Sequence, residues 1–127
     1  MAEHMTTVGL AAPANMRIPA ANLAAWTSKD WTHGTQIDEL SDFADIVVET
    51  RNSSYEITII AGRSGEVLIR GGKFFPEKTP AEVLGASLGG SFLKRRGIYS
   101  GLKLEILHDG RRIVTSPVCS ITVQTVI

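Results

Sequence analysis

The sequence predicts a mainly β protein, a small antiparallel β-barrel or sandwich of about six or seven strands, with one short helix and an irregular N-terminal arm. Two observations carry this prediction. Residues 102–107 alternate apolar with charged side chains, which is the period of a half-buried strand. Asp109-Gly110 then favours a tight reversal, because glycine takes positive φ freely, and the β-branched stretch 112–115 follows. We therefore expect a β-hairpin whose apolar face other strands cover.

Length and composition limit the chain to one domain plus an arm. With 127 residues, 43% of them hydrophobic, it is long enough for one core and short for two. The 13 basic and 13 acidic residues cancel, which removes the overall field that binds nucleic acid or anionic membranes non-specifically. A single cysteine, with no signal-peptide pattern and no membrane-length apolar run, predicts a soluble cytoplasmic protein without membrane partners.

Charge divides the chain into two parts. Residues 1–45 contain two basic and six acidic residues, whereas residues 46–127 contain eleven basic and seven acidic ones. The first β-branched run begins at the same boundary. We therefore predict a largely irregular arm over 1–45 and a small β-barrel domain over 46–127.

Both tryptophans lie in the arm. Alanine and leucine after Pro19 favour a short helix from Ala20 to Trp26. A helix of this length is stable only when it packs against another part of the protein. A tryptophan buries a large area, so the arm must dock somewhere. The interpretation that we favour is that the arm packs across its own barrel. The other is an interface with another subunit, anchored by Leu23, Trp26 and Trp31.

The domain opens with three strands joined by turns. Residues 46–50 are β-branched, residues 55–60 alternate between apolar and polar side chains, and residues 66–70 follow a glycine-containing reversal. These segments predict a meander. Residues 73–76 predict a further extended piece that Pro76 ends.

The best helix start of the domain is at Thr79. Its hydroxyl can cap a helix, Pro80 suits the first helical position, and Glu82 completes a capping box. We predict a short helix that Gly89-Gly90 ends and that plugs one end of the barrel.

Two features near the C-terminal end complete the predicted domain. Pro117 interrupts the last β-run and indicates an edge or a corner, because proline cannot donate to a ladder. Beyond it, Cys119 is expected to be a small buried residue.

No motif for chemistry stands out. A nucleophilic serine or cysteine would need a positioned base, and His108 lies at the predicted hairpin tip. His33 has no second ligand at metal spacing, and the glycine pairs do not follow the phosphate-loop pattern. We therefore predict no catalytic, cofactor-binding or metal-binding residues and no cofactor, and we rank a small enzyme or ligand-binding barrel third among the function classes.

Residues 94–96 form the one dense basic cluster of the sequence. Basic groups beside aromatic platforms bind single-stranded nucleic acid in many small barrels. The residues predicted for such a surface are Phe92, Lys94, Arg95, Arg96, Tyr99, Arg111 and Arg112. We favour a solvated loop, or a partner for the acidic arm, because a basic overall charge is the usual footprint of nucleic-acid binding.

The favoured function is a non-catalytic interaction module. In it the barrel is a scaffold that the arm fastens to identical or different subunits, so that a protein partner or a homo-oligomer is expected. A barrel that binds single-stranded nucleic acid is the first alternative.

Overall fold

Short strands and two long ones make up most of the described chain. The computed structural model describes residues 20–29, 31–90 and 92–124. Its helical elements are α2 (Ala20–Thr27) and the single 3-10 turns η2 (Ile37–Glu39) and η3 (Gly62–Ser64). Its strands are β1 (Gly34–Gln36), β2 (Asp45–Thr50), β3 (Ser54–Ala61), β4 (Glu66–Gly71), β5 (Phe75–Ser87), β6 (Leu93–Arg95), β7 (Gly97–Tyr99), β8 (Lys103–His108) and β9 (Arg111–Gln124).

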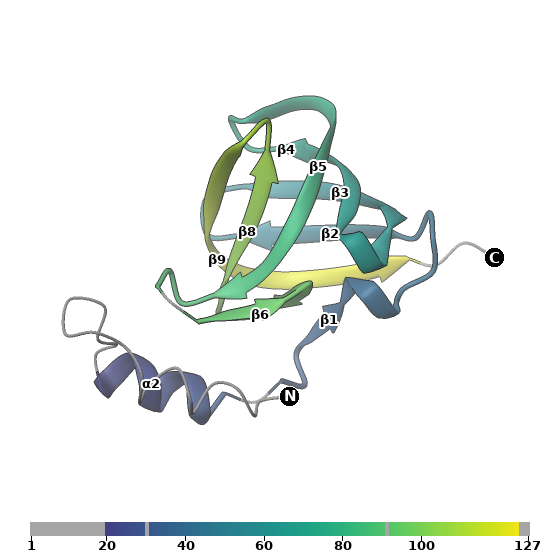
Figure 1. Cartoon of the computed structure of the whole chain (residues 1–127). Helices are drawn as coiled ribbons and strands as arrows, with labels where there is room; N and C mark the ends of the chain where they lie inside the picture. Colours follow the sequence, from purple (N-terminus) through teal and green to yellow (C-terminus); the bar gives the residue numbers. More distant parts are fainter. Residues whose placement is uncertain (1–19, 30, 91, 125–127) are drawn as a thin grey trace.

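Antiparallel pairing joins most of these strands into one curled sheet (Figure 1). The strand order is β4-β3-β2-β9-β8-β5-β6, and β4 also pairs with β5. Strands β2, β3, β4, β5, β8 and β9 therefore follow one another in a continuous ring of pairings, which we call the closed sheet. Strands β1 and β7 pair separately. The predicted mainly β, antiparallel fold is confirmed, and α2 matches the short helix that the sequence favoured from Ala20 to Trp26.

Two long, bent strands produce the closure. β5 pairs with β4 through residues 75–82 and with β8 through residues 82–87. β9 pairs with β8 up to Pro117 and with β2 from Val118 onward. Pro117 lies where β9 changes partner, so its missing N–H falls where the ladder is interrupted. This confirms the predicted corner.

The predicted hairpin and meander are present. Residues 46–50, 55–60 and 66–70 lie within β2, β3 and β4, and these strands pair in sequence. The hairpin of β8 and β9 turns at Asp109 and Gly110, whose φ angles are 53° and 75°. Positive φ at both central residues is the property for which an Asp-Gly pair is suited in a two-residue hairpin loop.

One face of each strand supplies the core. Inward side chains of the closed sheet form the main core, whose buried members include Ile46, Ile57, Ile69, Phe75 and Ile106. Ile37 and Ala44 belong to the same core although both precede residue 46. The described part of the arm therefore contributes to the core of the sheet. The division into an arm and a domain at this boundary stays a prediction.

The predicted helix at Thr79 is wrong, because these residues lie in β5. The Thr79 hydroxyl donates to the carbonyl oxygen of Glu77 at 2.7 Å instead of capping a helix. Gly85 has a φ of 151° beside a register shift, and a Cβ there would overlap the carbonyl oxygen of Lys94. A capping side chain is worth about 1 kcal/mol, which the pairing of residues 79–82 with β4 outweighs. Pro76 does not end the strand, because it lies in the register shift between Phe75 and Thr79, where the ladder with β4 is interrupted.

Cys119 is exposed, so the prediction that it is buried is wrong. In the pairing of β2 with β9, Ser120 faces Glu49 whereas Val118 faces Thr50, so Cys119 is an extra residue in a β-bulge. A bulge reverses which residues face the core. Val118 is 3% exposed in consequence.

Candidate functional site

Trp26 docks the arm mainly on residues 92–102, which connect β5 to β8. This side chain is 2% exposed, and its ring stacks on Phe92 with the centroids 5.3 Å apart. It also meets the edge of Trp31 at 5.1 Å. Together with Tyr99 and Leu102, these side chains form a second core, which we call the aromatic cluster. Packing of the arm on its own chain therefore accounts for the burial of Trp26.

Polar contacts hold the segment that follows α2. The Lys29 ammonium donates to the carbonyl oxygen of Ser100 at 2.6 Å. The Trp31 ring lies 5.0 Å from the Tyr99 ring, edge to face, and the Lys94 ammonium lies 5.2 Å from the Trp31 centroid. A cation over an indole contributes about 0.5–1 kcal/mol at an exposed site. Trp31 is only partly buried, so it has both a structural contact and a solvent-facing surface.

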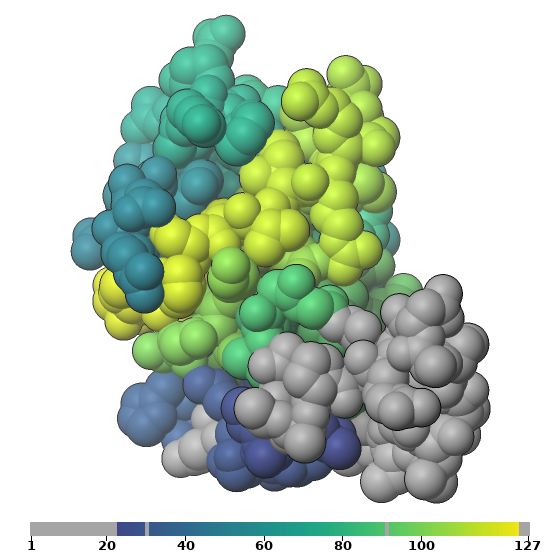
Figure 2. Space-filling view, turned by 90° about the vertical axis from the view of Figure 1, so that its left-hand side faces the viewer, coloured from purple at the N-terminus to yellow at the C-terminus, as the bar shows by residue number. Residues whose placement is uncertain are grey.

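Apart from Trp26, residues 23–27 of α2 are exposed, and Leu23, Ala24 and Ala25 among them are apolar. Among residues 23–27, Trp26 alone is buried, and Leu23 is 37% exposed. No residue of the helix is charged. Figure 2 shows residues of α2 at the molecular surface, beneath the strands of the closed sheet. A helix that lacks a charged face is usually covered on more than one side. The interface predicted through Leu23, Trp26 and Trp31 stays a prediction.

The structure does not gather the predicted nucleic-acid residues on one surface. Phe92 and Tyr99 are 6% and 5% exposed and belong to the aromatic cluster, so their rings are not open platforms. Arg96 is turned inward, with a φ of 60°. Its guanidinium donates to Glu82 at 2.8 Å and to the carbonyl oxygen of Val83 at 2.9 Å. These three side chains are structural.

The two adjacent arginines of β9, Arg111 and Arg112, differ in their contacts. Arg112 pairs with Glu105, its Nε donating at 2.6 Å, and the Glu105 side chain is 3% exposed. Ser87 donates to the other carboxylate oxygen, and its hydroxyl accepts from the Gly89 amide at 3.0 Å. Arg111 is exposed and has no ion pair among the described residues, and the same holds for Arg95. These two are the free cations of the predicted set in the described part of the chain.

Tyr99 links the aromatic cluster to the acidic part of the arm. Its hydroxyl donates to the Gln36 side-chain oxygen at 2.9 Å. Burial raises the pKa of the Tyr99 phenol, and the nearby carboxylates of Glu39 and Asp38 raise this pKa further. The phenol therefore stays protonated near neutral pH and remains a hydrogen-bond donor.

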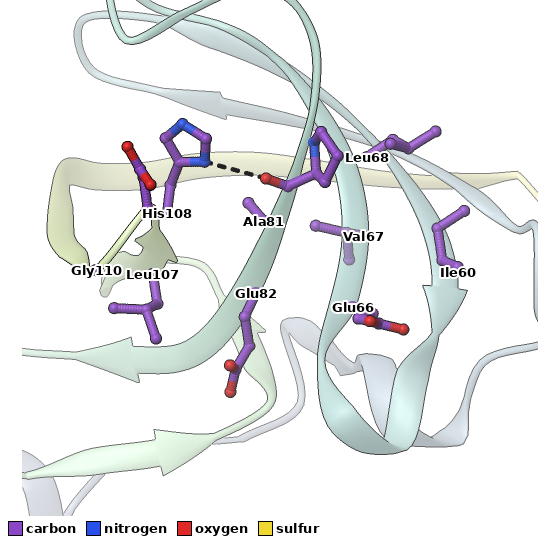
Figure 3. A pocket seen from close by; sticks show the side chains of 11 residues that line it. Ile60, Glu66, Val67, Leu68, Ala81, Glu82, Leu107, His108 and Gly110 are labelled. Atoms are coloured by element: carbon purple, nitrogen blue, oxygen red, sulfur yellow. Dashed lines mark hydrogen bonds between the residues drawn. The ribbon is translucent and has the colours of Figure 1, made fainter.

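A groove of about 550 Å³ crosses the sheet near the β8–β9 turn (Figure 3). Its lining residues are Ile60, Glu66, Val67, Leu68, Pro80, Ala81, Glu82, Leu107, His108, Asp109 and Gly110. His108 Nδ1 lies 3.1 Å from the carbonyl oxygen of Pro80. A carbonyl oxygen only accepts, so Nδ1 is the protonated nitrogen. The sequence placed His108 at the hairpin tip, and the structure makes it half-buried and hydrogen-bonded there.

A smaller pocket of about 260 Å³ brings Cys119 and His33 into one lining. His33 is exposed, and its Nδ1 lies 3.1 Å from the Thr32 hydroxyl. Among the described residues, no group of three or more His, Cys, Asp or Glu side chains could hold a metal ion. The helices that the structure describes include none long and apolar enough to cross a membrane.

Sequence reasoning missed Glu105, Gln36 and Ile37. The alternation in residues 102–107 places Glu105 on the outer face of its strand, where a carboxylate is expected to meet water. Only the folded sheet brings Ser87 and Arg112 over it. Ile37 lies among acidic residues in the sequence, without a repeating pattern that would have indicated its burial.

Comparison with protein-family models, with curated proteins and with solved structures finds no match to this chain. The structure by itself defines a class, a small mainly β protein with a closed antiparallel sheet that one short helix precedes.

Proposed function

We propose that this chain is a non-catalytic assembly module, in which the closed sheet is a scaffold and the exposed face of α2 fastens it to a partner. One observation carries the proposal. Helix α2 has no charged residue, yet Leu23, Ala24 and Ala25 are exposed in the described structure. Apolar surface of this kind is removed from water when a second protein covers it. Trp26 fixes the orientation of the helix by packing on the sheet.

A second copy of the chain is the partner that the charges favour. The net charge is zero, so copies do not repel one another through a common charge. The excess of acidic residues in 1–45 and of basic residues in 46–127 also makes the arm of one copy complementary to the domain of another. We place this assembly in the cytoplasm, because an exposed free thiol such as Cys119 persists in a reducing compartment.

The molecular mass in solution tests the proposal. Sedimentation of the full chain should give a mass above the 13.7 kDa of one copy. The variant Leu23→Glu places a charge on the exposed face of α2 and should sediment as a single copy. Phe74→Glu is the matched control, because Phe74 is also exposed, at 46%, but lies in the turn between β4 and β5. It should keep the mass of the unchanged chain.

Two results would overturn the proposal. One is a full chain that sediments as a single copy even at high protein concentration. The other is a Leu23→Glu variant that assembles as well as the Phe74→Glu control. Single-stranded nucleic-acid binding is the alternative function, and the exposed side chains of Arg95 and Arg111 support it.

A further inference from the structure

The groove beside the β8–β9 turn has apolar walls that come from neighbouring strands. Ile60 of β3, Leu68 of β4 and Leu107 of β8 are half-buried aliphatic residues that line it. Pro80 of β5 faces Leu68 across the ladder. Figure 3 shows these strands side by side with the lining side chains between them. At about 550 Å³ the groove falls within the size range of small-molecule sites.

The charges along the groove have one sign. Its lining includes three carboxylates, from Glu66, Glu82 and Asp109, and no lysine or arginine. Glu66 and Glu82 are direct partners across the β4–β5 ladder. Like charges in this position destabilise a sheet. In Figure 3 the Glu66 and Glu82 side chains lie on neighbouring strands at the same end of the groove.

Arg96 compensates the charge of one of the three carboxylates. Its guanidinium pairs with Glu82 at 2.8 Å. Glu66 and Asp109 are exposed, and neither forms an ion pair with any residue that the structure describes. The groove therefore combines apolar walls with uncompensated negative charge. A cationic group there would relieve the repulsion between Glu66 and Glu82.

His108 adds a further acceptor. Its Nδ1 proton is donated to Pro80, and its ring meets the Phe75 ring at 5.5 Å, which fixes the orientation of the imidazole. The Nε2 atom of the neutral ring is then an acceptor. An N–H donor of a ligand finds carboxylate oxygens and an imidazole nitrogen on the lining, in addition to the aliphatic side chains.

We propose that this groove binds a small organic ammonium ion with an apolar body. The aliphatic walls would hold the hydrocarbon part, and Glu66, next to Glu82 on the neighbouring strand, would hold the cation. This site lies on the closed sheet and does not depend on the assembly through α2.

A titration with three related probes tests the chemistry. Phenethylammonium, phenethyl alcohol and phenylacetate share one apolar body and differ in charge. Titrated into the full chain and followed by backbone-amide NMR shifts, the ammonium should perturb residues that line the groove and bind at least tenfold more tightly than the alcohol. Phenylacetate should bind more weakly than both. Equal binding of ammonium and alcohol, or shifts confined to other surfaces, would overturn the proposal.

Two matched variants test the assigned carboxylate. Glu66→Gln should weaken phenethylammonium binding about threefold to fivefold, as expected for one partly solvated charge. Glu77→Gln removes the same charge from an exposed position on β5 outside the lining, and should change the affinity less than about twofold. Both residues are exposed, so both variants keep the fold. Equal effects of the two substitutions would show that the lining carboxylate has no special role.

Discussion

At the scale of single residues, two buried charges are paired in the structure. The Glu105 carboxylate is nearly inaccessible to water, and Arg112 covers it from the surface with a side chain that is 55% exposed. Arg96 is the reverse case, a buried guanidinium whose partner Glu82 is 35% exposed. Each pair joins a buried charge to one that reaches solvent. Loss of the outer member therefore leaves the inner charge without its counter-ion, which is the costly outcome.

Replacing Arg112 with alanine should destabilise the protein by about 2 kcal/mol. Removing one partner of a fully buried pair costs about 3–5 kcal/mol, and the exposure of Arg112 lowers this value because water reaches the pair. The neighbouring Arg111→Ala is the control and should change stability by less than about 0.5 kcal/mol. Urea unfolding of the two variants measures the difference. Equal unfolding midpoints would contradict the role assigned to the Glu105 pair.

At the scale of elements, β5 and α2 show how tertiary contacts select secondary structure. Residues 79–82 carry a helix-capping pattern, yet they lie in a strand with β4 on one side and β8 on the other from Glu82 onward. Conversely, the eight residues of α2 are too few for a stable isolated helix. The helix exists because Trp26 docks into the aromatic cluster. Its stability should therefore depend on that single contact.

The variant Trp26→Ala should release α2 while the closed sheet stays folded. The substitution removes ring contacts with Phe92 and Trp31, and its cost cannot exceed the free energy of undocking the arm. Hydrogen exchange should show faster exchange at the amides of residues 24–29 and unchanged protection in β2, β3 and β4. Leu23→Ala, on the exposed face, should leave both regions unchanged. Equal loss of protection in β3 would show that the arm is an integral part of the core.

At the scale of the whole molecule, the ring of pairings lies between Asp45 and Gln124. The main core is complete from Ile37 onward, whereas the aromatic cluster needs Trp26. The molecule therefore has one core that the sheet closes around and a smaller one that the arm completes. These two cores should differ in their dependence on the arm.

Deletion of residues 1–32, which keeps β1, should leave a domain that unfolds in one cooperative transition. Its stability should fall, because exposing a large apolar side chain such as Phe92 costs about 1.5–3 kcal/mol. The shortened chain should also sediment as one copy, since α2 is absent. Thermal unfolding followed by circular dichroism, together with sedimentation, measures both properties. A chain that shows no cooperative transition would contradict the independence of the main core.

The sequence by itself determined the hairpin of β8 and β9, the meander of β2 to β4, and the corner at Pro117. Each rests on local chemistry, namely alternation with a period of two, an Asp-Gly pair suited to positive φ, and a residue without an N–H. Local signals predict structure well where the fold agrees with them.

The tertiary structure alone decided the strand over residues 79–87, the burial of Arg96 and Glu105, the outward position of Cys119 and the lining of the acidic groove. The reason is that each depends on partners distant in the chain. Glu66 and Glu82 become neighbours only when β4 pairs with β5, and Arg96 meets Glu82 only when the sheet closes. A one-residue bulge lets Val118 and Ile121 both face the core, which leaves Cys119 between them outside. Sequence patterns report local preferences, whereas closure brings together side chains that no local pattern relates.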